Sequence, residues 1–242
     1  MNEIFLEGTI ELILSILLVG LVVFKLNTSL RRHRKVWVLS SVALSLVSIT
    51  ISVVVFLGVL DVAYSAVWVR MVRGIVSGYL PGVIFIFVMF AGALKKDHPW
   101  KKTLMGVRTE LSVVGFILYL PHTLLYTAFS APYGIANLFS GDIRLFSQLM
   151  TWTGLTNSIL LILLGITSFR GIRQRMKATT WIRIQKWAYL FYFNCFVHYM
   201  TLSIYGGHYE RAVLYTLIYG SYLCMKVKKE LADHYSKIVR VA

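Results

Sequence analysis

The chain alternates long apolar stretches with short polar segments. A helix needs about 20 apolar residues to cross the hydrocarbon core of a bilayer, and seven stretches approach that length. They cover residues 8–26, 36–60, 77–94, 107–130, 145–169, 182–206 and 209–226. Only a short polar segment around Gly206 and Gly207 separates the last two, and these glycines permit a tight turn. The pattern predicts an all-α polytopic membrane bundle of seven transmembrane helices.

The basic residues lie on one side of the predicted spans. Of the 25 Lys and Arg residues, 21 lie in or beside the segments that follow the first, third, fifth and seventh spans. The four exceptions are Arg70, Arg73, Arg144 and Arg211. Because cationic loops stay in the cytoplasm, we expect the N-terminus outside and the C-terminus inside. This orientation requires an odd number of spans and therefore favours seven over six.

The composition supports a membrane location and excludes other classes. Hydrophobic residues make up 57% of the chain and charged residues 14%, which leaves too little polar surface for a water-soluble globule. A net charge of +15 would suit a nucleic-acid-binding protein, but here the charges fall between apolar runs and indicate membrane topology instead. The first apolar run lacks the basic opening of a cleavable signal peptide, so we interpret it as a retained helix.

The chain is predicted to be one membrane domain. No internal repeat and no Pro/Gly/Ser-rich linker divides it. We distinguish an N-terminal two-helix membrane segment (1–76), a membrane core (77–226) and a basic cytoplasmic tail (227–242). The chain has no GxGxxG motif after a strand, and the tail is too short for a nucleotide-binding module. Any nucleotide-dependent reductant would therefore have to come from a partner.

Two of the six histidines, His122 and His198, lie inside predicted spans. His122 is 12 residues beyond Glu110, about 18 Å along a helix, and His198 is 13 residues beyond Gln185, about 20 Å. Both imidazoles are therefore expected at nearly one depth in the outer half of the bilayer. There they could bind a haem iron from two sides. The alternative is that each histidine only donates a hydrogen bond to a neighbouring helix.

The residues around both histidines resemble the ferric-reductase-like transmembrane family. This family includes NADPH oxidases, metalloreductases and the haem-binding membrane subunit of periplasmic methionine sulfoxide reductase. The resemblance rests on residues 108–111, 115–116, 122, 126, 163–170, 181, 188–190 and 198–199. With weaker similarity it covers about 77–226, which implies a six-helix core plus one added N-terminal helix. It also implies that His122 and His198 are the metal ligands of one haem b in the outer leaflet.

Members of this family often contain a second haem nearer the cytoplasm, and the sequence departs from the family there. Gln185 and Thr109 stand at the corresponding positions, and neither offers an imidazole. The resemblance therefore implies that the inner haem is missing and that a flavin, FMN or FAD, takes its place, as in the metalloreductases. Basic residues between the fifth and sixth spans could bind the flavin phosphate: Arg173, Arg175, Lys177, Arg183 and Lys186. Such charges are also expected of any cytoplasmic loop.

The sequence and the resemblance thus predict a haem b electron-transfer protein of the cell membrane. Such a protein could act as the membrane subunit of an oxidoreductase whose reductase is a separate partner. Its electrons would come from a cytoplasmic flavin reductase or from free reduced flavin. They would pass to an acceptor at the outer face, such as a partner protein, a quinone, ferric iron or oxygen. Aromatic residues of the sixth span could line the route or simply pack: Trp187, Tyr189, Phe191, Tyr192 and Phe193.

Two other functions remain open from the sequence. One is a non-redox seven-helix receptor or transporter, and the other is an assembly subunit that binds no haem. A retinal-type receptor would need a lysine midway through its last span, and residues 209–224 contain none. A transporter would be expected to have carboxylates deep in the membrane, whereas the spans offer only Glu11 and Glu110 near their ends.

Overall fold

The computed structural model describes residues 2–60, 67–139 and 145–241, and within these ranges it contains helices and no strands. This confirms the expected all-α class. The helices are α1 (Asn2–Lys25), α2 (Asn27–Arg32), α3 (Arg34–Phe56), α4 (Val67–Val76), α5 (Tyr79–Ala93), α6 (Pro99–Phe129), α7 (Ala131–Phe139), α8 (Leu145–Ser168), α9 (Arg170–Arg173), α10 (Ala178–Gln185), α11 (Ala188–Tyr205) and α12 (Tyr209–Val241).

Four of these helices, α1, α3, α6 and α8, are long and apolar enough to cross a membrane. The pair α4 and α5, bent by 56°, adds a fifth if it forms one span. Over the described ranges α11 and α12, the expected sixth and seventh spans, are less apolar. Asn194 and His198 interrupt the apolar sequence of α11, and α12 continues into a charged segment. The protein is therefore a multi-pass helical bundle, while seven spans and their orientation stay predictions.

The helix boundaries differ from the predicted spans in two places. The stretch 182–206 is divided between α10 and α11, which are separated by Lys186 and Trp187. The helix α12 runs over 33 residues, about 50 Å, so the expected boundary between core and tail at residue 227 lies inside one continuous helix. Its extension carries the charged residues that follow the apolar stretch 209–226, and these charges favour water over lipid.

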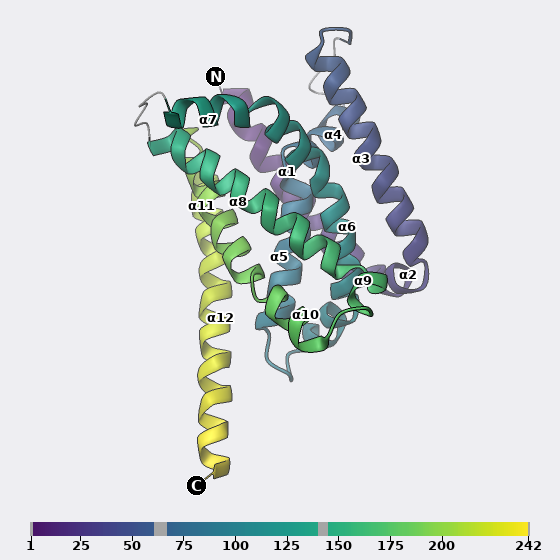
Figure 1. Ribbon diagram of the computed structural model, residues 1–242, viewed down its shortest axis with the longest axis vertical. Coiled ribbons are helices and arrows are strands. Elements are labelled where there is room, and N and C mark those ends of the chain that lie inside the picture. The colour runs from purple at the N-terminus through teal and green to yellow at the C-terminus, as the bar shows by residue number, and fades with distance from the viewer. Residues whose placement is uncertain (1, 61–66, 140–144, 242) are drawn as a thin grey trace.

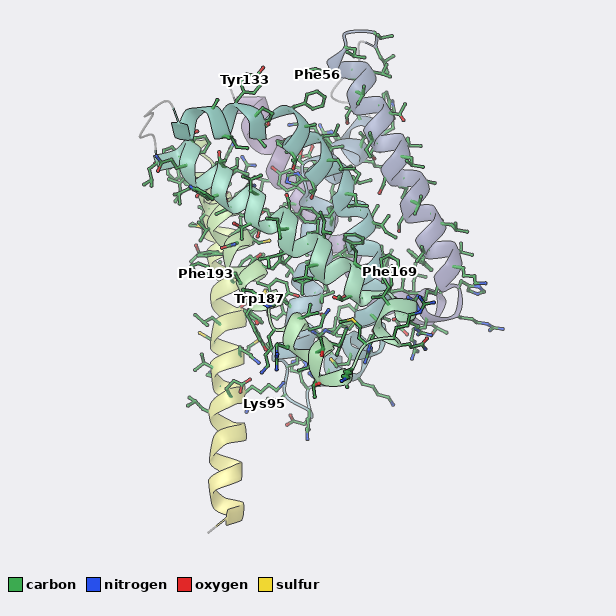
Figure 2. The ribbon with its side chains drawn as sticks, viewed as in Figure 1. Phe56, Lys95, Tyr133, Phe169, Trp187 and Phe193 are labelled. Carbon is green, nitrogen blue, oxygen red and sulfur yellow. The ribbon has the colours of Figure 1, made fainter. Side chains whose placement is uncertain are left out.

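The helix α6 lies at the centre of the bundle and packs against α3, α5 and α8, while α11 packs against α8 and α12. Figure 1 shows the N-terminus and α7 at one end of the bundle and α2, α9 and α10 at the opposite end. The last helix, α12, extends beyond this second end toward the C-terminus. Figure 2 places Lys95 at the second end as well, and Phe56 and Tyr133 at the first. The basic segments therefore gather at one end, as a cytoplasmic face requires.

Large apolar side chains cover the outside of the bundle. Leu17 of α1 is 63% exposed, Leu39 of α3 is 67% exposed and Ile159 of α8 is 68% exposed. Contiguous apolar surface of this kind is unfavourable in water and favourable against lipid tails. The surface therefore supports the membrane location that the composition predicts.

One carboxylate inside the bundle has a cationic partner. Glu110 of α6 is 4% exposed and accepts a hydrogen bond of 3.2 Å from Nη2 of Arg170, at the start of α9. This ion pair connects the central helix to the turn after α8. Glu110 is therefore neutralised by a cation instead of facing a second carboxylate, as paired-carboxylate catalysis would require.

Candidate functional site

His122 is positioned by α6 and by the bend between α4 and α5. Its Nδ1 lies 2.8 Å from the carbonyl oxygen of Val76, the last residue of α4. Because a carbonyl only accepts, Nδ1 of the neutral ring carries the proton and Nε2 keeps its lone pair. The ring also lies against Gly78, where a Cβ would stand 3.3 Å from Nδ1. Gly78 has a φ of +80°, so the bend requires glycine for its backbone as well as for the close approach.

His198 of α11 is positioned by α8 in a similar way. Its Nδ1 lies 2.9 Å from Oγ1 of Thr153. The hydroxyl of Thr153 donates its own hydrogen to the carbonyl oxygen of Leu149, at 2.5 Å, so Oγ1 accepts from His198. The ring therefore presents Nε2 as its unprotonated nitrogen, the same tautomer as in His122.

The two histidines lie on helices α6 and α11, which a pair of tyrosines connects. The ring of Tyr119 is 5.3 Å from that of His122, and its hydroxyl lies 3.2 Å from the hydroxyl of Tyr199, the residue after His198. Tyr126 covers another side of His122, with ring centroids 4.6 Å apart. The structure thus brings both predicted ligands to one region, surrounded by tyrosines.

This arrangement supplies features that a histidine ligand of a haem needs. Each ring is fixed through Nδ1 by a backbone or hydroxyl oxygen, which sets its orientation and leaves Nε2 available. Two protein ligands are sufficient because the porphyrin supplies the other four nitrogens. Glycine also lies beside His198, where a Cβ at Gly154 would be 3.9 Å from Cε1. The two imidazoles are therefore candidate ligands for a b-type haem.

The hydrogen bond that Thr153 accepts from His198 can be tested separately. We expect Thr153→Val to lower haem affinity by about tenfold, because loss of a group that orients a metal ligand typically costs 10–100-fold. Titration of the purified apoprotein with haemin measures this change. Ser158→Ala is the matched control, since its hydroxyl bonds only the backbone of the same helix α8. Equal haem affinity in the two variants would contradict the role given to Thr153.

A small cavity of about 30 Å³ lies nearer the basic end of the bundle, between α5, α6, α8, α10 and α11. Its polar lining comes from Arg108, Ser112, Ser168 and Gln185, and its aromatic lining from Phe85, Phe191 and Tyr192. Ser112 precedes His122 by 10 residues, or about 15 Å along α6. The cavity is large enough for one or two waters. The cavity therefore marks a second polar region, which lies nearer the basic end of the bundle than the histidines do.

Gln185, where the family often places an inner-haem ligand, faces this cavity. Its amide donates a hydrogen bond of 3.1 Å to Oγ1 of Thr167. Gln185 is the last residue of α10 and is not part of α11. The estimate of about 20 Å between Gln185 and His198 assumed one continuous helix, and that assumption is wrong. An amide is a poor iron ligand, and the absence of an inner haem stays a prediction.

Aromatic rings connect the cavity to His122. Phe191, which lines the cavity, lies 5.4 Å from Phe85, and Phe85 lies 5.9 Å from Tyr119, whose ring is next to His122. Of the five sixth-span aromatics considered from sequence, Phe191 and Tyr192 are buried here. Trp187, Tyr189 and Phe193 are 50%, 52% and 62% exposed, and Figure 2 shows Trp187 and Phe193. These three do not line an internal route.

The basic residues expected to bind a flavin phosphate lie outside the cavity. All five are exposed and follow one another through α9, α10 and the adjoining turns: Arg173, Arg175, Lys177, Arg183 and Lys186. The guanidinium of Arg173 covers the ring of Trp181 at 4.1 Å. The cation that reaches the cavity is Arg108. The loop residues can therefore contact a phosphate in solution, whereas the basic side chain that lines the cavity comes from α6.

The sequence did not single out three residues that shape the site. Thr153 and Val76 orient the histidines, and Arg108 lines the cavity. Val76 acts through its backbone, so no side-chain pattern could reveal it. Arg108 belongs to the Arg-Thr-Glu-Leu segment on which the resemblance rests, and this segment was the available signal.

Fold and site together define a multi-pass membrane protein with one histidine on each of two helices, α6 and α11, near a shared pair of tyrosines. The description of the family that matches is "Ferric reductase like transmembrane component", and the match covers residues 73–196, about half of the chain. The chain therefore belongs to the ferric reductase-like transmembrane family, as the resemblance indicated. His122 lies within the matched residues, and His198 lies just beyond them.

A relative from Treponema pallidum (strain Nichols), described as an uncharacterized protein, is 34% identical over 155 residues. The matched region covers 61% of this chain and 42% of the relative, so the chain spans less than half of that protein's length. No solved structure matches the chain. Membership of the family suggests a role in electron transfer across the membrane.

Proposed function

We propose that the protein is a haem b electron-transfer protein of the cell membrane, with His122 and His198 as the two axial ligands. The observation that carries this proposal is the oxygen that lies within hydrogen-bond distance of each Nδ1, from which we assign the same tautomer to both rings. The carbonyl of Val76 can only accept from Nδ1 of His122, and the hydroxyl of Thr153, which donates to Leu149 O, accepts from Nδ1 of His198, so each Nε2 keeps its lone pair. What an iron ligand needs beyond a helix-to-helix hydrogen bond is an Nε2 that can bind the metal, and a haem spectrum tests that difference.

The protein's own residues would position a bound haem and exclude water from it. When bound, a haem supplies one-electron chemistry, and the chain sets its ligands and its surroundings. The helices α6 and α11 carry the imidazoles, and Tyr119, Tyr126 and Tyr199 pack around them. Two neutral ligands in an apolar bundle would favour the iron state of lower charge and therefore a higher reduction potential.

The electron donor is proposed to act at the basic end of the bundle. A cytoplasmic flavin reductase or free reduced flavin, FMN or FAD, would contact the exposed loop residues through its phosphate. Arg108 and the aromatic lining of the cavity would lie next on the route, followed by Phe85 and Tyr119. The acceptor would be a partner protein, a quinone or ferric iron at the outer face. The enzyme would in that case be a membrane oxidoreductase that depends on a separate source of reductant.

Electron transfer can be measured in liposomes that contain the purified protein and trapped ferricyanide. Reduced FMN, which its phosphate keeps outside, is added without oxygen, and the loss of ferricyanide colour is followed. We expect reduction well above the rate of empty liposomes, because molecules with the basic end outward conduct electrons inward. Liposomes with His198→Ala protein serve as the control. A wild-type rate equal to that of empty liposomes would contradict the proposed direction and donor.

A further inference from the structure

The hydrogen-bond ladder of α6 is interrupted directly before His122. Pro121 has no N–H, so the carbonyl of Ile117, four residues earlier, loses its partner within the helix. Pro121 is among the most completely buried side chains, and Ile117 is 6% exposed. A buried carbonyl without a donor is costly, especially where no water reaches it. Another group must therefore supply a hydrogen bond at this point.

The donor comes from α3. The hydroxyl of Ser45 donates a hydrogen bond of 2.9 Å to the carbonyl oxygen of Ile117. Ser45 is 5% exposed, and Ser41 and Ser48 next to it on α3 are 3% and 1% exposed, so small side chains let the two helices approach closely. The bond thus replaces the one that Pro121 removes.

The helix α3 also contacts α6 beyond the proline. Phe56, at the end of α3, lies 4.5 Å from Phe129, at the end of α6, and Figure 2 shows Phe56 at that end of the bundle. The helix α3 therefore bridges the interruption, bonding α6 before Pro121 and packing on it after His122. All of α3 lies outside the residues that the family match covers.

We propose that Ser45 is a positioning residue for His122, and that the N-terminal helix α3 stabilises the interrupted helix that carries this ligand. The proposal rests on the proposed function only for its effect on haem. The coupling between Ser45 and Pro121 is a property of the chain itself and can be measured with or without a bound cofactor.

A double-mutant cycle tests the coupling. Ser45→Ala should lower the midpoint of thermal unfolding by about 3 °C, because it leaves the Ile117 carbonyl unsatisfied. In the Pro121→Ala background residue 121 again has an N–H for Ile117, so Ser45→Ala should change the midpoint by less than about 1 °C. Ser41→Ala is the matched control, since its hydroxyl bonds only Trp37 O of the same helix.

The haem is a second readout. In wild-type protein that contains haem, Ser45→Ala should shift the reduction midpoint potential or the electron paramagnetic resonance of the low-spin iron, while Ser41→Ala should change neither. If wild-type protein binds no haem, the proposed function fails and the unfolding cycle still tests the Ser45–Pro121 coupling. Additive unfolding effects in the cycle would overturn the coupling. A cycle that shows coupling, with haem signals unchanged in Ser45→Ala, would overturn the positioning of His122.

Discussion

Replacement of either histidine, His122→Ala or His198→Ala, should abolish haem binding. Loss of a group that only orients a ligand costs 10–100-fold in affinity, so loss of the ligand itself should cost at least about 100-fold. Both variants should therefore purify without the absorbance of a b-type haem. The pyridine haemochrome assay, normalised to protein, measures haem content directly.

A control separates loss of ligand from loss of fold. His33→Ala removes an exposed imidazole at the opposite end of the bundle, between α2 and α3, and should keep wild-type haem content. All three variants should elute as a single peak in size-exclusion chromatography. If one of the two intramembrane variants retained full haem content, the assignment of that histidine as a ligand would be wrong.

The second large effect is expected where α6 and α8 pack most closely. A Cβ at Gly165 of α8 would overlap the ring of Phe116, which is 8% exposed and packs against Phe169. We expect Gly165→Leu to lower the free energy of unfolding by about 1–3 kcal/mol, since overfilling a packed interior shifts side chains and backbone from their positions. The thermal midpoint should fall by roughly 5 °C or more.

Gly220→Leu is the matched control for this substitution. Gly220 is also helical, but no atom lies within 4 Å of its Cβ position, and the residue is exposed. Its replacement should leave the midpoint nearly unchanged. Because Gly165 also lines the cavity, Gly165→Leu should slow electron delivery from reduced FMN as well. Equal stability of the two leucine variants would contradict the close packing of α6 on α8.

The sequence predicted the helical class and the two intramembrane histidines because both depend on local patterns. Apolar runs of about 20 residues reveal spans, and polar groups are rare within them. The same patterns did not reveal the break between α10 and α11 at Lys186 and Trp187, because a short interruption hardly changes average hydropathy. The continuation of α12 to Val241 was missed for a related reason, since a helix can leave the membrane without any change in backbone structure.

The partners that orient the site depend on contacts between distant segments. Three hydrogen bonds join residues that are 46, 45 and 72 positions apart. They link His122 with Val76, His198 with Thr153, and Ser45 with Ile117. No periodicity in one sequence encodes such pairs. A proline within a predicted helix shows the missing N–H in the sequence itself, whereas the serine that compensates for Pro121 became visible only when α3 was placed beside α6.

The most direct test of the central claim is the ultraviolet-visible spectrum of the purified wild-type protein, recorded before and after addition of dithionite. The account predicts the sharp α and β bands of a reduced, low-spin b-type haem with two imidazole ligands, at about one haem per chain. A well-folded preparation that shows no haem, even after incubation with haemin, would contradict it and favour a membrane subunit without a redox role.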